Sequence, residues 1–173
     1  ELALARFPDA PRHDPSIGRF RAAYVGHVEE QDFRMAGSSG GLVTWTATEL
    51  LRQGLVDGVA HVGAVEGRSE DEPFFAFRVS RTEAEVRRRA KSRYYPIEMS
   101  AVLQEIREIP GRYAVVGVPC FIKAVHLLRA EEPVLRERIA FTLGLFCGHM
   151  KSARMVESFS WQMGEAVERV EAV

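Results

Sequence analysis

The chain has 173 residues, of which 46% are hydrophobic and 27% charged, as is typical of a single globular domain. Its 23 basic and 24 acidic residues give a formal net charge of -1, so the sequence lacks the basic excess of a nucleic-acid-binding protein. The longest uncharged apolar runs, such as residues 140–147, fall far short of the roughly 18 residues that a membrane span needs. We therefore expect that the protein does not bind nucleic acid and does not span a membrane.

The only thiols are those of Cys120 and Cys147. Two cysteines do not make a disulfide framework, which favours a reducing, cytoplasmic compartment. A four-iron cluster normally takes four thiolates, and a structural zinc ion takes four ligands. Cysteines of this chain alone therefore complete neither kind of site.

The first third of the chain alternates between strand and helix signals. Residues 1–20 are rich in Pro, Arg and Asp without a sustained period, and they predict an irregular lead-in. Residues 21–26 contain the strand-like Ala-Ala-Tyr-Val core, and residues 38–54 have helical spacing, with Ser38 or Ser39 as the cap. Residues 56–63 are apolar and β-branched, which predicts a buried strand.

The middle of the chain continues this alternation. Residues 74–80 predict a strand, and Thr82 and Glu85 have the capping-box spacing of a helix start. The run Arg87-Arg88-Arg89 is typical of a solvated helix face. After a polar and aromatic loop at 91–96, residues 99–109 place Met99, Val102, Leu103 and Ile106 on one helical face.

The last third predicts strands at 113–116 and 139–146 and helices at 121–130 and 151–163. Strands that alternate with helices of this length indicate an α/β domain over residues 21–173. We expect a mixed, largely parallel central sheet flanked by helices.

Three segments lie where an α/β domain commonly binds ligands. Ser38, Ser39, Gly40 and Gly41 precede a predicted helix, where free backbone N–H groups attract anions, although the same pattern is also an ordinary helix entry. The loop 91–95 combines positive charge with flat rings that suit a phosphate and an aromatic cofactor. It is equally consistent with a loop that only covers a sheet edge.

The third segment is the turn 117–120, which follows a strand and precedes a helix; residues 146–149 repeat the arrangement after the next strand. Adjacent parallel strands would bring Cys120 and Cys147 to one edge of the sheet. The helix start would lower the pKa of the Cys120 thiol, favouring a thiolate that binds metal or attacks an electrophile. A small buried apolar cysteine is the alternative, and His149 is either a ligand or a surface residue.

Five motifs in order resemble the beta subunit family of coenzyme F420 hydrogenases and dehydrogenases over residues 18–163. They are Ser-Ser-Gly-Gly at 38–41, Leu-Val-Asp-Gly-Val at 55–59, Ser-Arg-Tyr at 92–94, Gly-Val-Pro-Cys at 117–120 and Gly-Leu-Phe-Cys-Gly at 144–148. The resemblance implies an iron-sulfur flavoprotein that passes electrons between clusters, FAD and a hydride carrier such as coenzyme F420. It also implies an electron-transfer partner, such as hydrogenase or dehydrogenase subunits.

The same resemblance supplies candidate site residues. It implies cofactor contacts at Ser38, Ser39, Gly40, Gly41, Ser92, Arg93, Tyr94, Gly117 and Pro119, and metal ligation at Cys120 and Cys147. Val118 and Phe121 stand where the family commonly has Thr and Gln, which makes the surroundings of Cys120 more apolar. Family members usually carry further cysteine clusters, so the resemblance implies that this chain is a fragment of a longer protein.

Two other functions remain open from the residues. Cys120 could act as the nucleophile of a hydrolase or transferase, with His126 or His149 as base. The chain could also be a non-catalytic docking domain of an electron-transfer complex. The isolated chain is expected to fold, to bind no intact four-iron cluster and to hold FAD weakly or not at all.

Overall fold

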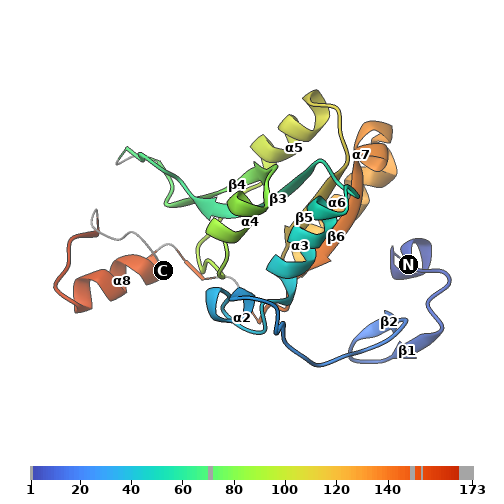
Figure 1. The fold of residues 1–173 in the computed structure, drawn as a ribbon, viewed down its shortest axis with the longest axis horizontal. Coiled ribbons are helices and arrows are strands. Elements are labelled where there is room, and N and C mark those ends of the chain that lie inside the picture. Colours follow the sequence, from blue (N-terminus) through green and yellow to red (C-terminus); the bar gives the residue numbers. More distant parts are fainter. Residues whose placement is uncertain (1, 70–71, 149–150, 153, 168–173) are drawn as a thin grey trace.

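The computed structural model describes residues 2–69, 72–148, 151–152 and 154–167. Its centre is a four-stranded sheet in the order β4-β3-β5-β6 (Figure 1). The three strands that run parallel are β3 (Gly58–Ala64), β5 (Tyr113–Gly117) and β6 (Ile139–Gly144), whereas β4 (Phe75–Ser80) pairs antiparallel with β3. The predicted mixed, largely parallel sheet is confirmed.

Helices cover both faces of this sheet (Figure 1). The first face packs against α3 (Leu42–Arg52) and α4 (Glu83–Arg88), and the second against α5 (Ser100–Glu108), α6 (Pro119–Glu131) and α7 (Pro133–Arg138). Neighbouring strand residues point to opposite faces. Val59 therefore joins the core under α3 and α4, and Ala60 joins the core under the other three helices.

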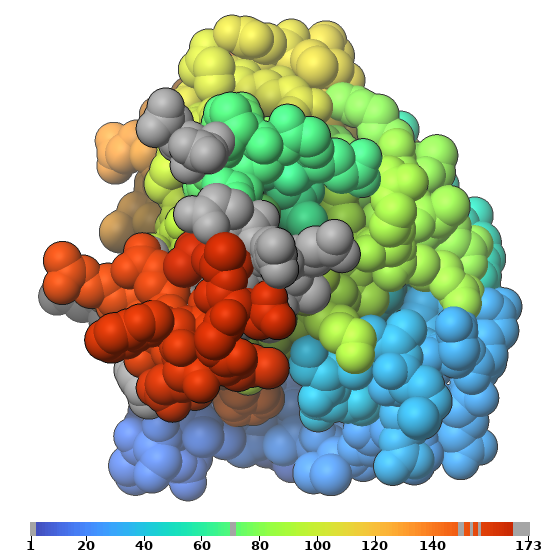
Figure 2. Space-filling model, turned by 90° about the vertical axis from the view of Figure 1, so that its left-hand side faces the viewer, coloured from blue at the N-terminus to red at the C-terminus, as the bar shows by residue number. Residues whose placement is uncertain are grey.

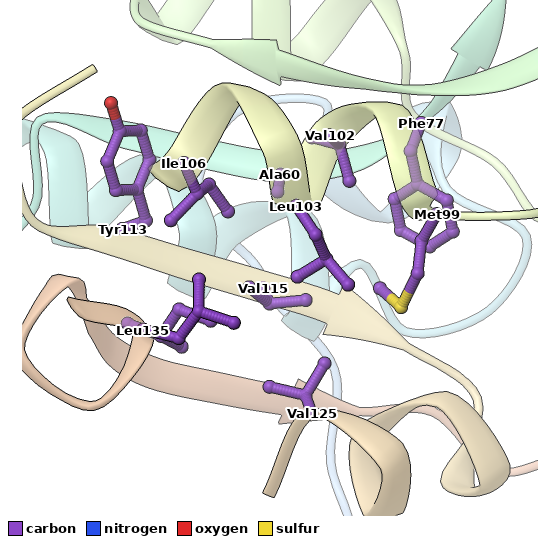
Figure 3. Packing of buried hydrophobic residues seen from close by; sticks show 11 residues of the cluster. Ala60, Phe77, Met99, Val102, Leu103, Ile106, Tyr113, Val115, Val125 and Leu135 are labelled. Carbon is purple, nitrogen blue, oxygen red and sulfur yellow. The ribbon is translucent and has the colours of Figure 1, made fainter. Parts of the chain in front are cut away.

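The larger core forms around β5. Figure 3 shows side chains of α5, α6 and α7 gathered about Val115, with the Tyr113 ring beside Ile106. The Tyr113 hydroxyl donates a hydrogen bond to the carbonyl of Ile109 over 3.0 Å, so this buried phenol is satisfied. Ile106, Tyr113 and Val115 are completely buried, which fixes α5 on the sheet.

Local sequence signals are confirmed in α4 and α5. Thr82 caps α4, and both hydrogen bonds of the predicted capping box with Glu85 are present. The predicted face of α5 is buried through Val102, Leu103 and Ile106, and Met99 is buried immediately before that helix.

The N-terminal part differs from the sequence expectation. Within residues 1–20, predicted to be irregular, the structure has a helix and an antiparallel hairpin: α1 (Leu2–Arg6), β1 (Arg12–Asp14) and β2 (Gly18–Phe20). The strand predicted at 21–26 is wrong, because this segment lies along the surface without a sheet partner. Its apolar side chains are exposed, with Tyr24 at 92%.

Two further helices complete the described chain. They are α2 (Phe33–Ala36), which precedes α3, and α8 (Arg154–Gln162), within the predicted 151–163. Figure 2 shows α8, in orange and red, on the surface of one face below the green β3–β4 hairpin. None of the helices in the described ranges combines the length and hydropathy needed to cross a membrane.

Candidate functional site

The candidate site lies at the carboxyl edge of the sheet, where β5 and β6 end together. Gly117 pairs with Gly144, and the N–H of Leu145 donates to the carbonyl of Gly117 over 2.9 Å. Cys120 and Cys147 each follow by three residues, and both are exposed. Parallel pairing therefore brings the two cysteine turns to one edge, as the sequence predicts. The alternative of a small buried apolar cysteine is wrong for Cys120.

The turn 117–120 is shaped by the start of α6. Pro119 occupies the first turn of the helix. Its fixed φ suits the helix there, and no hydrogen bond within the helix requires the N–H that proline lacks. Gly117 is buried, and an added Cβ would lie 3.3 Å from Cβ of Phe121. The packing at the end of β5 therefore leaves Cys120 on the surface at the beginning of α6.

The loops 38–41 and 92–94 meet, although they lie far apart in the sequence. The backbone N–H of Ser92 donates a hydrogen bond to Oγ of Ser38 over 2.8 Å. Ser38, Ser39 and Ser92 are all exposed, so their polar groups face solvent at this junction.

Neither serine caps α3, which corrects the sequence prediction. The helix starts at Leu42, and its cap residue Gly41 has φ of 75° without a side-chain cap hydrogen bond. An added Cβ on Gly41 would lie 2.5 Å from the carbonyl oxygen of Phe33. Contacts within the chain therefore already require glycine at 41.

Arg93 is the half-buried cation of this site. Its Cζ lies 5.2 Å from the ring centroid of Phe75, and one Nη donates to the carbonyl of Ala90 over 3.4 Å. Burial lowers the pKa of the Arg93 guanidinium, and its buried Nε has no hydrogen-bond partner in the described part of the chain. Phe75 pairs with Ala64, the last residue of β3, so Arg93 lies at the same carboxyl edge as the cysteine turns.

The structure thus brings the predicted site residues together to two different extents. Ser38 and Ser92 are in direct contact, whereas the turns of Cys120 and Cys147 share the sheet edge with Arg93. Tyr94, which follows Arg93 in the chain, is 54% exposed. Hydroxyl groups, an unsatisfied guanidinium N–H and a free aromatic ring suit an anionic ligand with a flat ring system.

The described residues contain no group of three or more His, Cys, Asp or Glu side chains that would hold a metal ion. Cys120 and Cys147 remain predicted ligands that need partners from elsewhere. His149, considered from the sequence as a ligand or a base, lies outside the described residues.

The environment of His126 argues against its use as a base for Cys120. Nε2 of His126 lies 3.4 Å from Oγ1 of Thr142, and its buried Nδ1 has no hydrogen-bond partner. Cys120 is exposed at the start of the same helix. Among the described residues His126 is therefore not hydrogen-bonded to the thiol, so His126 does not form the nucleophile-base pair expected of a hydrolase.

Sequence reasoning missed a buried polar cluster between the end of α4 and the β3–β4 pair. Ser80 Oγ lies 2.8 Å from Nε2 of His61 and accepts a hydrogen bond of the same length from Nη1 of Arg89. The predicted solvated face at 87–89 is correct only for Arg88, because Arg87 stacks on Phe33 with its Cζ 4.5 Å from the ring centroid. The sequence signal that could have indicated this cluster is His61, a polar residue inside an apolar predicted strand.

Two family profiles match the chain, and both describe the coenzyme F420 hydrogenase/dehydrogenase beta subunit. The profile of its N-terminal part matches residues 23–104, and the profile of its C-terminal part matches residues 111–173. Comparison with curated proteins finds no significant match.

Among solved structures, a chain of the F420-reducing NiFe hydrogenase complex from Methanosarcina barkeri has a similar fold, with a TM-score of 0.74 and 22% sequence identity. The match covers 93% of this chain and 56% of that one, so this chain spans about half the length of its structural neighbour.

Proposed function

Because the chain belongs to the coenzyme F420 hydrogenase/dehydrogenase beta subunit family, we propose that it is part of an iron-sulfur flavoprotein oxidoreductase. Its role would be to pass electrons between clusters, FAD and a hydride carrier, coenzyme F420 being the carrier that the family name points to. We further propose that it works in the cytoplasm with an electron-transfer partner protein or hydrogenase and dehydrogenase subunits.

One observation carries this proposal: the hydrogen bond between Ser92 and Ser38 joins two of the family motifs at the sheet edge where the cysteine turns end. The sequence alone does not require residues 54 positions apart to meet. Their contact makes a single surface of the loops to which the family resemblance assigns the cofactor. In α/β sheets this edge is the usual ligand site.

The side chains at this edge fit the charged part of FAD. The buried Nε of Arg93 has no partner, and a phosphate oxygen is a strong acceptor for such a group. Ser39 and Tyr94 are exposed members of the two joined loops and would contribute a hydroxyl group and a ring face. FAD, when bound, would supply the exchange between hydride transfer and single-electron transfer. The protein's residues would bind and orient it.

The same residues do not fit a complete iron-sulfur cluster. Cys120 and Cys147 provide two thiolates, whereas a four-iron, four-sulfur cluster normally takes four. Any such cluster must draw its other ligands from outside the described residues. We propose that Cys120 and Cys147 contribute to that shared site.

The test is the absorbance of the protein expressed from its complete gene and purified without oxygen. Flavin and iron-sulfur bands are expected, and Arg93→Gln should lower FAD affinity about tenfold or more, because it removes a charged donor. Arg88→Gln is the charge-matched control, since the Arg88 side chain is 63% exposed and forms an ion pair with Glu66.

A colourless protein would contradict the flavoprotein proposal. Activity that disappears in a colourless protein on Cys120→Ser would instead favour the hydrolase or transferase. FAD affinity lowered equally by Arg93→Gln and Arg88→Gln would contradict the assignment of the site.

A docking role is the second candidate, and exposed apolar side chains favour it. Trp161 on α8 is 84% exposed, and Phe146 beside Cys147 is fully exposed. Large apolar side chains of this kind are enriched in protein interfaces. A protein that binds neither FAD nor iron but forms a tight complex with hydrogenase or dehydrogenase subunits would support this alternative.

A further inference from the structure

Three basic side chains gather where residues 6 and 7 meet α6, at a place that the proposed cofactor site does not use. Nη2 of Arg6 donates a hydrogen bond to the backbone carbonyl of His126 over 2.9 Å. The rings of Phe7 and His126 meet edge to face, with 5.9 Å between their centroids. Arg129 follows His126 by nearly one helical turn. In Figure 1, α1 lies on the side of the sheet where β6 is the edge strand, and α8 lies on the opposite side.

These three side chains share an unusual hydrogen-bonding deficit. Nε of Arg6, Nδ1 of His126 and Nε of Arg129 are all buried, and none of them has a hydrogen-bond partner among the residues that the structure describes. Buried polar groups are nearly always paired, so three unpaired nitrogens within one cluster need an explanation. An acceptor that binds among them would provide it.

The cluster also carries uncompensated positive charge. In the described part of the chain, neither Arg6 nor Arg129 forms an ion pair with a carboxylate. Burial and the charge of Arg6 lower the pKa of Arg129, and burial together with both arginines lowers the pKa of His126. Arginines brought together without a carboxylate repel one another, and a bound anion would remove this repulsion.

We propose that Arg6, His126 and Arg129 form a binding site for a phosphate-class oxyanion. A phosphate carries more acceptor oxygens and more negative charge than a carboxylate, and it therefore matches three donors better. Each guanidinium offers a planar pair of N–H donors, which is the geometry that binds phosphate oxygens. Arg6 and Arg129 are both only partly buried, so neither side chain is sealed inside the core.

The site would bridge two parts of the chain. Arg6 belongs to the five-residue α1, whereas His126 and Arg129 belong to α6. An oxyanion held by both arginines therefore ties the N-terminal helix to the α/β domain, and its binding should stabilise that contact. This inference is independent of the FAD proposal because it uses none of the residues at the carboxyl edge.

The test is calorimetric titration of the purified protein with inorganic phosphate at constant ionic strength. We expect saturable binding of one phosphate per chain. Arg6→Gln and Arg129→Gln should each weaken it at least tenfold. Lys123→Gln is the charge-matched control, since Lys123 is an exposed cation of the same helix, and it should change the affinity by less than twofold. Arg6→Gln, in the short peripheral helix, decides the matter if Arg129→Gln does not fold.

The following outcomes of the titration would overturn the proposal. They are the absence of saturable phosphate binding, equal weakening by Lys123→Gln, and acetate binding as tightly as phosphate. The Arg93→Gln variant separates this site from the cofactor site. Loss of phosphate binding in Arg93→Gln, together with retained binding in Arg6→Gln and Arg129→Gln, would assign the phosphate to the sheet edge and refute the cluster.

Discussion

The side chain of Arg89 lies directly over the backbone of Gly63, so that an added Cβ on Gly63 would be 2.6 Å from Cδ of Arg89. Arg89 continues from there to the hydroxyl group of Ser80, which it meets at 2.8 Å. Because Gly63 has no side chain, the side chain of Arg89 at the end of α4 can pass over β3 and reach the buried hydroxyl group of Ser80 in β4. This contact fixes α4 over the β3–β4 pair.

Gly63→Ala should displace Arg89 and weaken its hydrogen bond with Ser80. We expect a loss of about 1–3 kcal/mol in the free energy of unfolding, as for other added groups in a packed interior. Urea unfolding measures it. Gly144→Ala is the control, because an added Cβ there meets nothing within 4 Å. Equal effects of the two substitutions would show that the Arg89 contact is not the cause.

His61 should make stability depend on pH. Burial, followed by the charge of Arg89, lowers the pKa of His61 from 6.5 to about 4. Between these values the unfolded chain binds a proton that the folded chain does not, so stability is complete above pH 6.5 and falls as the pH falls toward 4. The shift corresponds to roughly 3 kcal/mol.

Urea unfolding at a series of pH values from about 7 to about 4 provides the measurement. His61→Asn keeps a polar partner for Ser80 but removes the titrating group. This variant should therefore lose less stability than the wild type across that interval. An unchanged pH dependence would contradict the assignment to His61.

Ser38→Ala should loosen the junction of the two candidate cofactor loops. It removes the acceptor of the Ser92 N–H, and a hydrogen bond of this kind contributes about 1 kcal/mol. Hydrogen exchange of the Ser92 amide should then become about fivefold faster. Ser39→Ala is the matched control because Ser39 is the exposed neighbour in the same loop. Unchanged exchange in Ser38→Ala would show that the bond does not persist in solution.

The two cysteines should limit iron binding by this chain. Anaerobic reconstitution of residues 1–173 with iron and sulfide should give well below four irons per chain, because two thiolates only half-ligate a four-iron cluster. Both thiols should react with a thiol reagent in the folded protein, since both are exposed. About four irons per chain, unchanged by Cys120→Ala, would contradict both the stoichiometry and the ligand assignment.

The sequence by itself determined the elements that depend on near neighbours. The capping box of Thr82 and Glu85 involves residues three apart, and the buried face of α5 follows from helical spacing. The alternation of strands and helices was enough to predict a mostly parallel sheet. Because parallel strands end at the same edge, it also predicted the common edge of the Cys120 and Cys147 turns.

Only the tertiary structure decided which partner each polar or extended segment finds. Residues 21–26 have strand-like composition, but a strand needs a neighbouring edge, and none in the described chain pairs with them. Ser38 had the chemistry to cap its own helix, yet its hydroxyl group accepts the N–H of Ser92. Arg89 belonged to an apparently solvated run, yet it reaches a buried serine. Such choices depend on contacts between residues remote in sequence, which composition and periodicity do not encode.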